Sequence, residues 1–443
     1  MNTPICDFVR QYADSDALRL HMPGHKGKRF TGAEECDITE IEGADSLYEA
    51  ATIIRESEKN AASLFGSADT LYSTEGSSQC IRAMVYMASL VAHTKGERPL
   101  IAAGRNAHKS FVSACALVDC DVMWIGCGSY LCCNIDAHEL DARLAGQKRV
   151  PQAVYVSSPD YLGNVCDIDK LRRVCDKYGM LLLVDNAHGA YLNFLEKSKH
   201  PMSAGADMYC DSAHKTLPVL TGGAYLHMSS ALPELLRERA RDAMALFGST
   251  SPSYLILCSL DKCNAYLDAG YREKLAHTAV QINELKTSLS RKGWCFTGDE
   301  PLKITICAKR AGYTGHELAR ILMGENIVCE FADPDYLVMM ITPETGAEGI
   351  KRLSDALDKI EIREAICEMP PKMTMPERVK SIREAMFCES EVIPLADCEG
   401  RVLAVANVAC PPAVPIVVCG ERIDRDAIEC FKYYGIEKLT VVK

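Results

Sequence analysis

Short apolar runs and amphipathic segments alternate along the first half of the chain. The run Met180–Val184 holds five apolar residues and suits a parallel strand that is buried on both faces. The segment before it, 169–179 (DKLRRVCDKYG), has the apolar spacing of a helix. Because this alternation continues from Ala68 to Leu226, the sequence predicts an α/β fold with a doubly wound, mostly parallel sheet.

The two ends of the chain follow other patterns. Near the N-terminus, the stretch 20–30 (LHMPGHKGKRF) contains a Pro and two Gly that interrupt regular structure. Helical spacing dominates from Ser253 to Leu289, a strand–helix–strand–helix series follows, and a last unit begins after the Pro pair at 370–371. The predicted parts are an N-terminal arm (1–50), a large domain (51–260), a small α/β domain (261–365) and a C-terminal domain (366–443).

Composition narrows the class of protein. The chain has 443 residues, of which 48% are hydrophobic, enough for two or three domains. The net charge of −11, without a basic block, argues against nucleic acid and anionic membranes as partners. The N-terminus lacks a signal pattern and no apolar run is long enough to span a bilayer, so we expect a cytoplasmic protein. The 22 cysteines are scattered without a C-x-x-C pair, which predicts reduced thiols, no disulfide framework and no metal site.

A candidate reactive lysine follows a short predicted strand, Met208–Cys210. Ser212, His214 and Lys215 come directly after it. Partial burial and neighbouring positive charge lower an amine's pKa and free its lone pair, as a Schiff-base lysine requires. A lysine after a strand is more commonly a surface charge, so the interpretation needs a second observation.

The second observation is the end of the buried run that closes at Asp185. Open α/β sheets bind ligands at the carboxyl ends of their strands, where Asp185 and then His188 stand. A carboxylate there can keep a pyridine nitrogen protonated, which makes pyridoxal phosphate (PLP) an electron sink. Considered alone, Asp185 also fits the N-cap of a helix.

A candidate anion site precedes both strands. The loop Glu75–Ser78 joins a predicted strand (ADTLYST) to a predicted helix (QCIRAMVYMASLVAH). Gly76 followed by Ser77 and Ser78 at a helix start offers free N–H groups, the helix dipole and two hydroxyls to one phosphate. The alternative is simple N-capping by Ser77.

These residues in this order look like the site of a fold-type I PLP enzyme, with the aspartate aminotransferase-like architecture. More narrowly, SAHKTLPVLTGGAYLH, VDNAHGAY, MPGHKG and RNAHKS resemble segments of the bacterial ornithine/lysine/arginine decarboxylase family. The chain begins almost at the MPGHKG arm, so it resembles the short type, which lacks an N-terminal wing domain. It departs from the family pattern at 49–52 and, within CPPAVPIVVCGERI, at Ala413 and Cys419.

The resemblance implies roles for the candidate residues. Lys215 would carry PLP, Asp185 would hold the ring nitrogen protonated, His188 would steady Asp185 or the ring oxygen, and His108 would stack on the ring. It also implies a homodimer with shared sites. The implied phosphate ligands are Gly76, Ser77, Ser78, Ser212, His214 and, from the neighbouring subunit, Thr250. The general acid that reprotonates the product carbanion is not identified.

The implied substrate is a basic amino acid: lysine, ornithine or arginine. Its distal cation needs an acceptor, because an unpaired charge in a dry pocket costs several kcal/mol. The acidic candidates are Glu75, Asp160 and Glu421, although each more commonly would be a solvated surface carboxylate.

Two other functions stay open at the level of sequence. Another fold-type I enzyme, an aminotransferase or a carbon–carbon lyase, would use the same lysine and aspartate. An aminotransferase normally keeps a late arginine for the substrate carboxylate, and Arg310, Arg320 and Arg352 are available. A non-catalytic homologue that binds PLP or a polyamine as a regulator is the second alternative.

Overall fold

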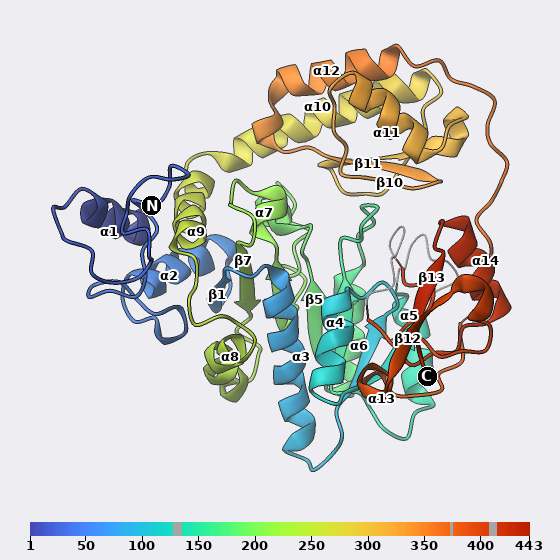
Figure 1. Ribbon diagram of the computed structural model, residues 1–443, viewed down its shortest axis with the longest axis horizontal. Helices are drawn as coiled ribbons and strands as arrows, with labels where there is room; N and C mark the ends of the chain where they lie inside the picture. The colour runs from blue at the N-terminus through green and yellow to red at the C-terminus, as the bar shows by residue number, and fades with distance from the viewer. Residues whose placement is uncertain (127–134, 373–374, 407–413) are drawn as a thin grey trace.

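The computed structural model describes residues 1–126, 135–372, 375–406 and 414–443. A large sheet flanked by helices forms the body of the molecule (Figure 1). The small domain lies above it in this view, and the C-terminal unit lies at its right. No helix in the described ranges is long and apolar enough to cross a membrane.

The large sheet has seven strands in the order β1-β7-β6-β5-β4-β2-β3. Five neighbouring strands run parallel, and only β7 runs against β6 and β1. The predicted doubly wound, mostly parallel sheet is therefore confirmed. The strand bounds are β1 Asp69–Ser73, β2 Leu100–Gly104, β3 Asp121–Ile125, β4 Ala153–Ser157, β5 Leu181–Asp185, β6 Met208–Asp211 and β7 Ala224–Met228.

Helices cover both faces of this sheet, which explains the unbroken apolar run in β5. Leu183 belongs to the core shared with α3 and α4, whereas Leu182 and Val184 belong to the core on the opposite face with α5 and α6. Every residue of the strand therefore has apolar neighbours, and no polar alternation is needed. The helices of this part are α2 Ile53–Phe65, α3 Ser77–His93, α4 Lys109–Leu117, α5 Ala137–Ala145, α6 Ile168–Tyr178, α7 Ala213–Thr216, α8 Glu234–Leu246 and α9 Tyr254–Asp268.

The N-terminal arm contains one helix that the sequence interpretation did not include. This helix, α1 Pro4–Ala13, buries Ile5 and Val9 in the core that also contains residues of α2 and α9. Between α1 and α2, the only helical turn in the described chain is the 3-10 turn Leu47–Glu49, in keeping with the Pro and Gly residues there.

The remaining chain forms two smaller units. The small domain has a four-stranded antiparallel sheet in the order β10-β11-β9-β8, and the C-terminal unit has the antiparallel pair β12 and β13. The small domain comprises α10 Tyr271–Arg291, β8 Phe296–Thr297, β9 Lys303–Cys307, α11 Gly315–Gly324, β10 Phe331–Ala332, β11 Tyr336–Met340 and α12 Gly346–Asp358. The C-terminal unit comprises α13 Ile382–Phe387, β12 Ser390–Pro394, α14 Arg425–Tyr433 and β13 Lys438–Val442.

Candidate active site

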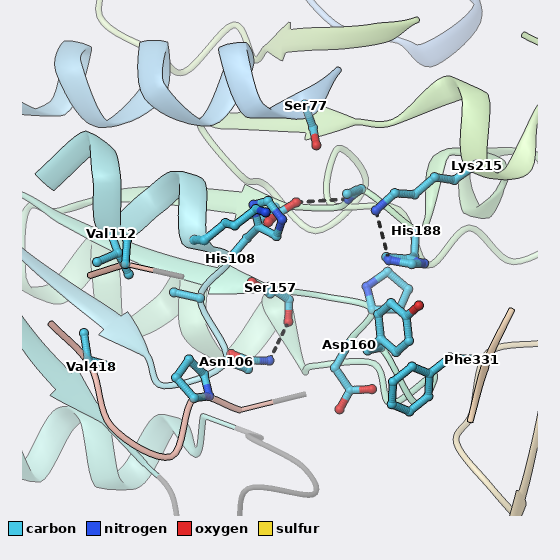
Figure 2. A pocket seen from close by; sticks show the side chains of 18 of the residues that line it. Ser77, Asn106, His108, Val112, Ser157, Asp160, His188, Lys215, Phe331 and Val418 are labelled. Atoms are coloured by element: carbon cyan, nitrogen blue, oxygen red, sulfur yellow. Dashed lines mark hydrogen bonds between the residues drawn. The ribbon is translucent and has the colours of Figure 1, made fainter. Parts of the chain in front are cut away.

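A cavity of about 450 Å³ opens at the carboxyl ends of the parallel strands. Five of the predicted residues line it together: Ser77, His108, Asp185, His188 and Lys215 (Figure 2). The small domain adds Phe331 to the lining, and the C-terminal unit adds Ala406, Pro415, Val417 and Val418. All three domains therefore meet at one pocket.

Asp185 is buried at the end of β5. One carboxylate oxygen accepts a hydrogen bond from the Tyr155 hydroxyl at 2.9 Å, and the other accepts from the backbone N of Ala187 at 3.2 Å. The next helical turn begins only at Ala190 and has Gly189 as its N-cap, so the interpretation of Asp185 as a helix cap is wrong. The Cys210 thiol is a third, weak donor to Asp185 at 3.7 Å. Three donors do not saturate the lone pairs of a carboxylate, which leaves acceptor capacity toward the pocket.

Lys215 lies in the short helix α7, and its Nζ is 3.1 Å from Nε2 of His188. Burial lowers the pKa of Lys215, although the negative charge of Asp185 opposes this effect. Burial also lowers the pKa of His188, and the positive charges of Lys303 and Lys215 lower it further. The His188 imidazole is therefore neutral and can accept a hydrogen bond from the lysine. The resemblance implied that His188 steadies Asp185 or the ring oxygen of the cofactor, and the structure adds a hydrogen bond between His188 and Lys215.

The start of α3 has a glycine N-cap and no capping side chain. Gly76 is the N-cap, with φ +70° and ψ −179°, a conformation essentially restricted to glycine. No side chain caps the helix, so the interpretation of Ser77 as a capping residue is wrong. The Ser77 hydroxyl instead accepts from Ser212 Oγ at 2.9 Å, which joins two of the predicted phosphate ligands.

The other predicted phosphate ligands lie around this start but do not line the cavity. Ser78 Oγ accepts a hydrogen bond from Ser110 Oγ at 2.8 Å. The His214 ring is bonded through Nδ1 to the Gly223 carbonyl at 2.9 Å. Of these predicted ligands only Ser77 lines the described pocket, and their role toward a phosphate stays a prediction.

His108 is the N-cap of α4, where its Nδ1 accepts from the backbone N of Ser110 at 3.2 Å. The ring is open to the pocket, yet surrounding protein atoms keep much bulk water away, and this desolvation lowers its pKa. The negative charge of Asp185 opposes this lowering of the His108 pKa, whereas the positive charge of Lys215 lowers it further. A neutral imidazole ring facing the pocket fits the predicted stacking role.

Thr250 does not line the pocket of its own chain. It is exposed on the loop between α8 and α9, where the neighbouring Ser249 donates its backbone N–H to Glu75 at 2.5 Å. Glu75 thereby ties this loop to the predicted phosphate loop. A contribution of Thr250 to a second subunit stays a prediction.

The other two acidic candidates are engaged within the chain. Glu421 is buried against the fully buried guanidinium of Arg105, to which it is bonded through both carboxylate oxygens. It is therefore neither a surface carboxylate nor free to hold a substrate cation. Asp160 does line the pocket, but one of its oxygens accepts from the backbone N–H groups of Leu162 and Asn164 at 2.9 Å each. Burial raises the pKa of Asp160.

Sequence reasoning missed Glu330, which the small domain brings to the pocket rim. Its Oε1 accepts from the hydroxyl of Tyr161, a lining residue, at 3.0 Å, and its charge acts on Lys215. Glu330 is exposed and directly precedes Phe331, which packs edge-to-face on Tyr161. An exposed glutamate before a two-residue strand carries no local signal, so only the tertiary contact reveals it.

None of the late arginines considered for an aminotransferase reaches this pocket. Arg310, Arg320 and Arg352 are exposed, and none lines the cavity in the described part of the chain. Arg352 instead donates to the carbonyls of Glu325 and Asn326. The described lining contains no arginine at all.

Comparison with known proteins agrees with this geometry. Residues 3–306 match the family described as "Orn/Lys/Arg decarboxylase, major domain". The chain belongs to the Orn/Lys/Arg decarboxylase family. Residues 360–438 match the C-terminal domain of the same family, so both family domains are present.

Two relatives illustrate the similarity. An arginine decarboxylase of Bacillus subtilis is 28% identical over 466 residues, which span 96% of this chain and 92% of the relative. The solved lysine decarboxylase of Francisella novicida superposes with a TM-score of 0.81 at 17% identity, covering 100% of this chain and 81% of that one. The similarity to members of the Orn/Lys/Arg decarboxylase family thus covers nearly the whole chain.

Solved structures from outside the Orn/Lys/Arg decarboxylase family share this fold. Serine palmitoyltransferase of Sphingomonas wittichii matches with a TM-score of 0.58 at 16% identity, over 81% of this chain and 83% of that one. The large domain therefore has the fold of fold-type I PLP enzymes, as the resemblance predicted.

Proposed function

We propose that this protein is a PLP-dependent decarboxylase of basic amino acids. The observation that carries the proposal is the convergence of Asp185, the Lys215–His188 pair and the start of α3 on one pocket without an arginine in its described lining. Membership of the family supports the reaction class, and its arginine and lysine decarboxylases support a basic substrate.

The residues present fit PLP. The uncapped N-terminus of α3 and the hydroxyls of Ser77 and Ser212 suit a phosphate. Asp185 has acceptor capacity for a protonated ring nitrogen. The buried Nδ1 of His188 and Oγ of Ser157 have no hydrogen-bond partner in the described structure, which leaves both available to a polar ligand in the pocket they line.

When bound, PLP supplies an electron sink for the bond between Cα and the leaving carboxylate. The chain's own residues prepare that reaction. Burial favours the neutral, nucleophilic amine of Lys215, and His188 orients it through its hydrogen bond. Asp185, itself oriented by Tyr155, keeps a proton on the ring nitrogen. The described lining contains no arginine that could hold the substrate carboxylate through two parallel hydrogen bonds, and its only cation besides Lys215 is the exposed Lys109. Without such a bidentate clamp, loss of the carboxylate is favoured over its retention.

Glu330 is the acceptor that we assign to the distal cation of the substrate. It is the carboxylate at the rim whose charge acts on Lys215, and its single side-chain donor in the described structure is Tyr161. Asp160 uses an oxygen for its own loop, and Glu421 is neutralised by Arg105. A carboxylate with free lone pairs beside apolar Phe331 suits an ammonium or guanidinium on an aliphatic stem.

A homodimer with shared sites is part of the proposal. In the arm, Leu18, Leu20, Met22 and Phe30 are between 64% and 82% exposed. Four large apolar side chains exposed within thirteen residues suit an interaction surface better than contact with water. The exposed position of Thr250 agrees with a role toward a second subunit.

The test is CO₂ release from lysine, ornithine and arginine by the purified protein with added PLP, with Lys215→Ala as the inactive control. We expect release from at least one of them, at least about tenfold faster than from norleucine, because norleucine lacks the cation that the pocket must pair. Amino transfer to a 2-oxo acid without CO₂ would instead identify an aminotransferase. Binding of PLP without any turnover would identify a regulator.

A further inference from the structure

A buried ion pair that the proposed reaction does not use lies behind the pocket. Lys303, the first residue of β9, is 2% exposed, and its ammonium is 2.8 Å from Oε2 of Glu300, which is 1% exposed. Burial raises the pKa of Glu300, and the charge of Lys303 opposes this rise. Removing two charges from water costs several kcal/mol per ion before their attraction is counted, so a buried pair is weak evidence for a purely stabilising role.

The contacts of this pair lead to a loop that lines the pocket. Lys303 Nζ also donates to the Asp160 carbonyl at 3.3 Å. The backbone N–H groups of 299–300 both donate to the Gly163 carbonyl, at 2.8 and 2.9 Å. A segment of the small domain therefore holds the loop 160–163 of the large domain through its backbone.

The fit between the two segments is close. Thr305 Oγ1 donates to the Leu162 carbonyl at 2.8 Å. Gly163 has φ +91°, and a Cβ there would be 3.3 Å from both the Cβ of Glu300 and the Cδ of Lys303. A side chain at this position would be strained by the positive φ and would require Glu300 and Lys303 to shift by a few tenths of an ångström, so the loop lies directly against the ion pair.

The other side of the same loop faces the reactive lysine. Tyr161 packs edge-to-face on His188, with 5.3 Å between ring centroids, and His188 is hydrogen-bonded to Lys215 (Figure 2). A continuous series of contacts thus runs from Lys303 through the loop and Tyr161 to His188 and Lys215.

The charge of Lys303 reaches the same two groups. It lowers the pKa of both Lys215 and His188, in the same direction as burial, which is the larger cause. Among the charged groups with the largest effect on Lys215, Asp185 and Glu330 act in the opposite direction and raise its pKa. Cys210, on β6, acts on it in that direction too. Lys303 is therefore the principal cation that offsets the two carboxylates.

We propose that the Glu300–Lys303 pair is a positioning element of the active site, which fixes the loop carrying Asp160 and Tyr161 and sets the position and charge environment of Lys215. The inference rests on the proposed function for the chemical role of Lys215. The small domain thereby prepares the reactive amine as well as contributing to the pocket wall.

The test measures the reactivity of Lys215 in cofactor-free protein. The rate of its acetylation by acetic anhydride is followed against pH by peptide mass spectrometry in wild type, Lys303→Met and Lys303→Arg. The matched control is Thr305→Val, which removes one loop contact and leaves every charge in place. Circular dichroism checks that each variant is folded.

We expect Lys303→Met to slow acetylation of Lys215 near pH 8 by roughly threefold or more, since loss of this cation raises the pKa of Lys215 and so lowers its deprotonated fraction. Lys303→Arg should retain the wild-type profile, and Thr305→Val should leave its midpoint unchanged. An unchanged profile in folded Lys303→Met would overturn the proposal.

If Lys303→Met does not fold, the double variant Glu300→Gln/Lys303→Met replaces the pair by neutral groups of similar volume, a change that buried pairs often tolerate. Its amide exchange in peptide 158–165 should be faster than in wild type, and exchange at the wild-type rate would contradict the positioning role. These readouts need no turnover. Absence of decarboxylation would therefore refute the proposed function without changing them.

Discussion

The buried pair of Arg105 and Glu421 should be the principal attachment of the C-terminal unit to the large domain. The side chains are 0% and 4% exposed, and both carboxylate oxygens receive a guanidinium hydrogen bond. Arg105 also donates to the Ile416 carbonyl at 3.4 Å, and Glu421 accepts from the Val418 backbone N at 2.7 Å. Val418 lines the pocket, so this pair fixes part of the pocket wall.

Replacing Arg105 by Met should cost about 3–5 kcal/mol, because Glu421 would be left as an uncompensated buried charge. The matched control is Arg422→Met, which changes the residue next to Glu421 in the sequence. Arg422 pairs with Glu377 at 2.9 Å, but the two side chains are 42% and 70% exposed. Solvent screening limits such a pair to about 0–1 kcal/mol. The double variant Arg105→Met/Glu421→Leu removes both charges and should recover most of the loss.

The assay is urea unfolding followed by circular dichroism, together with limited proteolysis of the C-terminal unit. Arg105→Met should lower the unfolding midpoint much more than Arg422→Met and should release the C-terminal unit to protease at lower urea. Equal midpoints for the two single variants would refute the reasoning, since it depends on burial rather than on pairing. No recovery in the double variant would show that packing of the arginine stem, and not the stranded charge, was responsible.

Three further predictions concern the site itself. Asp185→Asn should retain PLP, as measured by its visible absorbance, but should lose several orders of magnitude in kcat. The reason is that a neutral amide does not hold the ring nitrogen protonated. Near-normal turnover would mean that another group serves that nitrogen. Mixing inactive Lys215→Ala with an inactive Thr250→Ala variant should restore part of the activity, since one site of the hybrid dimer then contains both intact residues. Full activity of a monomer at high dilution would exclude shared sites. Glu330→Gln should raise KM for the basic substrate by about tenfold or more and reduce discrimination against norleucine; an unchanged KM would exclude it as the acceptor.

The local residue pattern was sufficient to predict a feature where a physical requirement restricts the residue types that can meet it. A strand with helices on both faces must be apolar throughout, so Met180–Val184 could be recognised as a central strand. The turn before α3 has a positive φ with an extended ψ and needs glycine, so Gly76 and the hydroxyls after it predicted an anion site. The order of these segments also predicted the family, which the match over residues 3–306 confirms.

Pattern was insufficient where a residue's role depends on a distant partner. Glu421 and Glu330 are both glutamates in ordinary contexts. In the folded chain the first is paired with an arginine 316 positions earlier, and the second accepts a hydrogen bond from Tyr161, which lines the pocket. The resemblance implied that His188 steadies Asp185 or the ring oxygen, whereas its contact with Lys215, 27 positions later in the chain, is seen only in the folded structure. The buried pairing of Lys303 could not be predicted from the sequence, because a lysine at the start of a strand usually points into solvent.

The sequence by itself determined the chemistry that is available: the lysine, the aspartate, the glycine-and-serine turn and the sheet that brings strand ends to one edge. Only the tertiary structure decided which charges are paired and which remain free. The physical reason is that hydrophobic periodicity is local, whereas burial and charge pairing depend on segments far apart in the chain. For this protein that difference separates Glu421, which is paired with Arg105 across two domains, from Glu330, which is exposed and bonded to the pocket residue Tyr161.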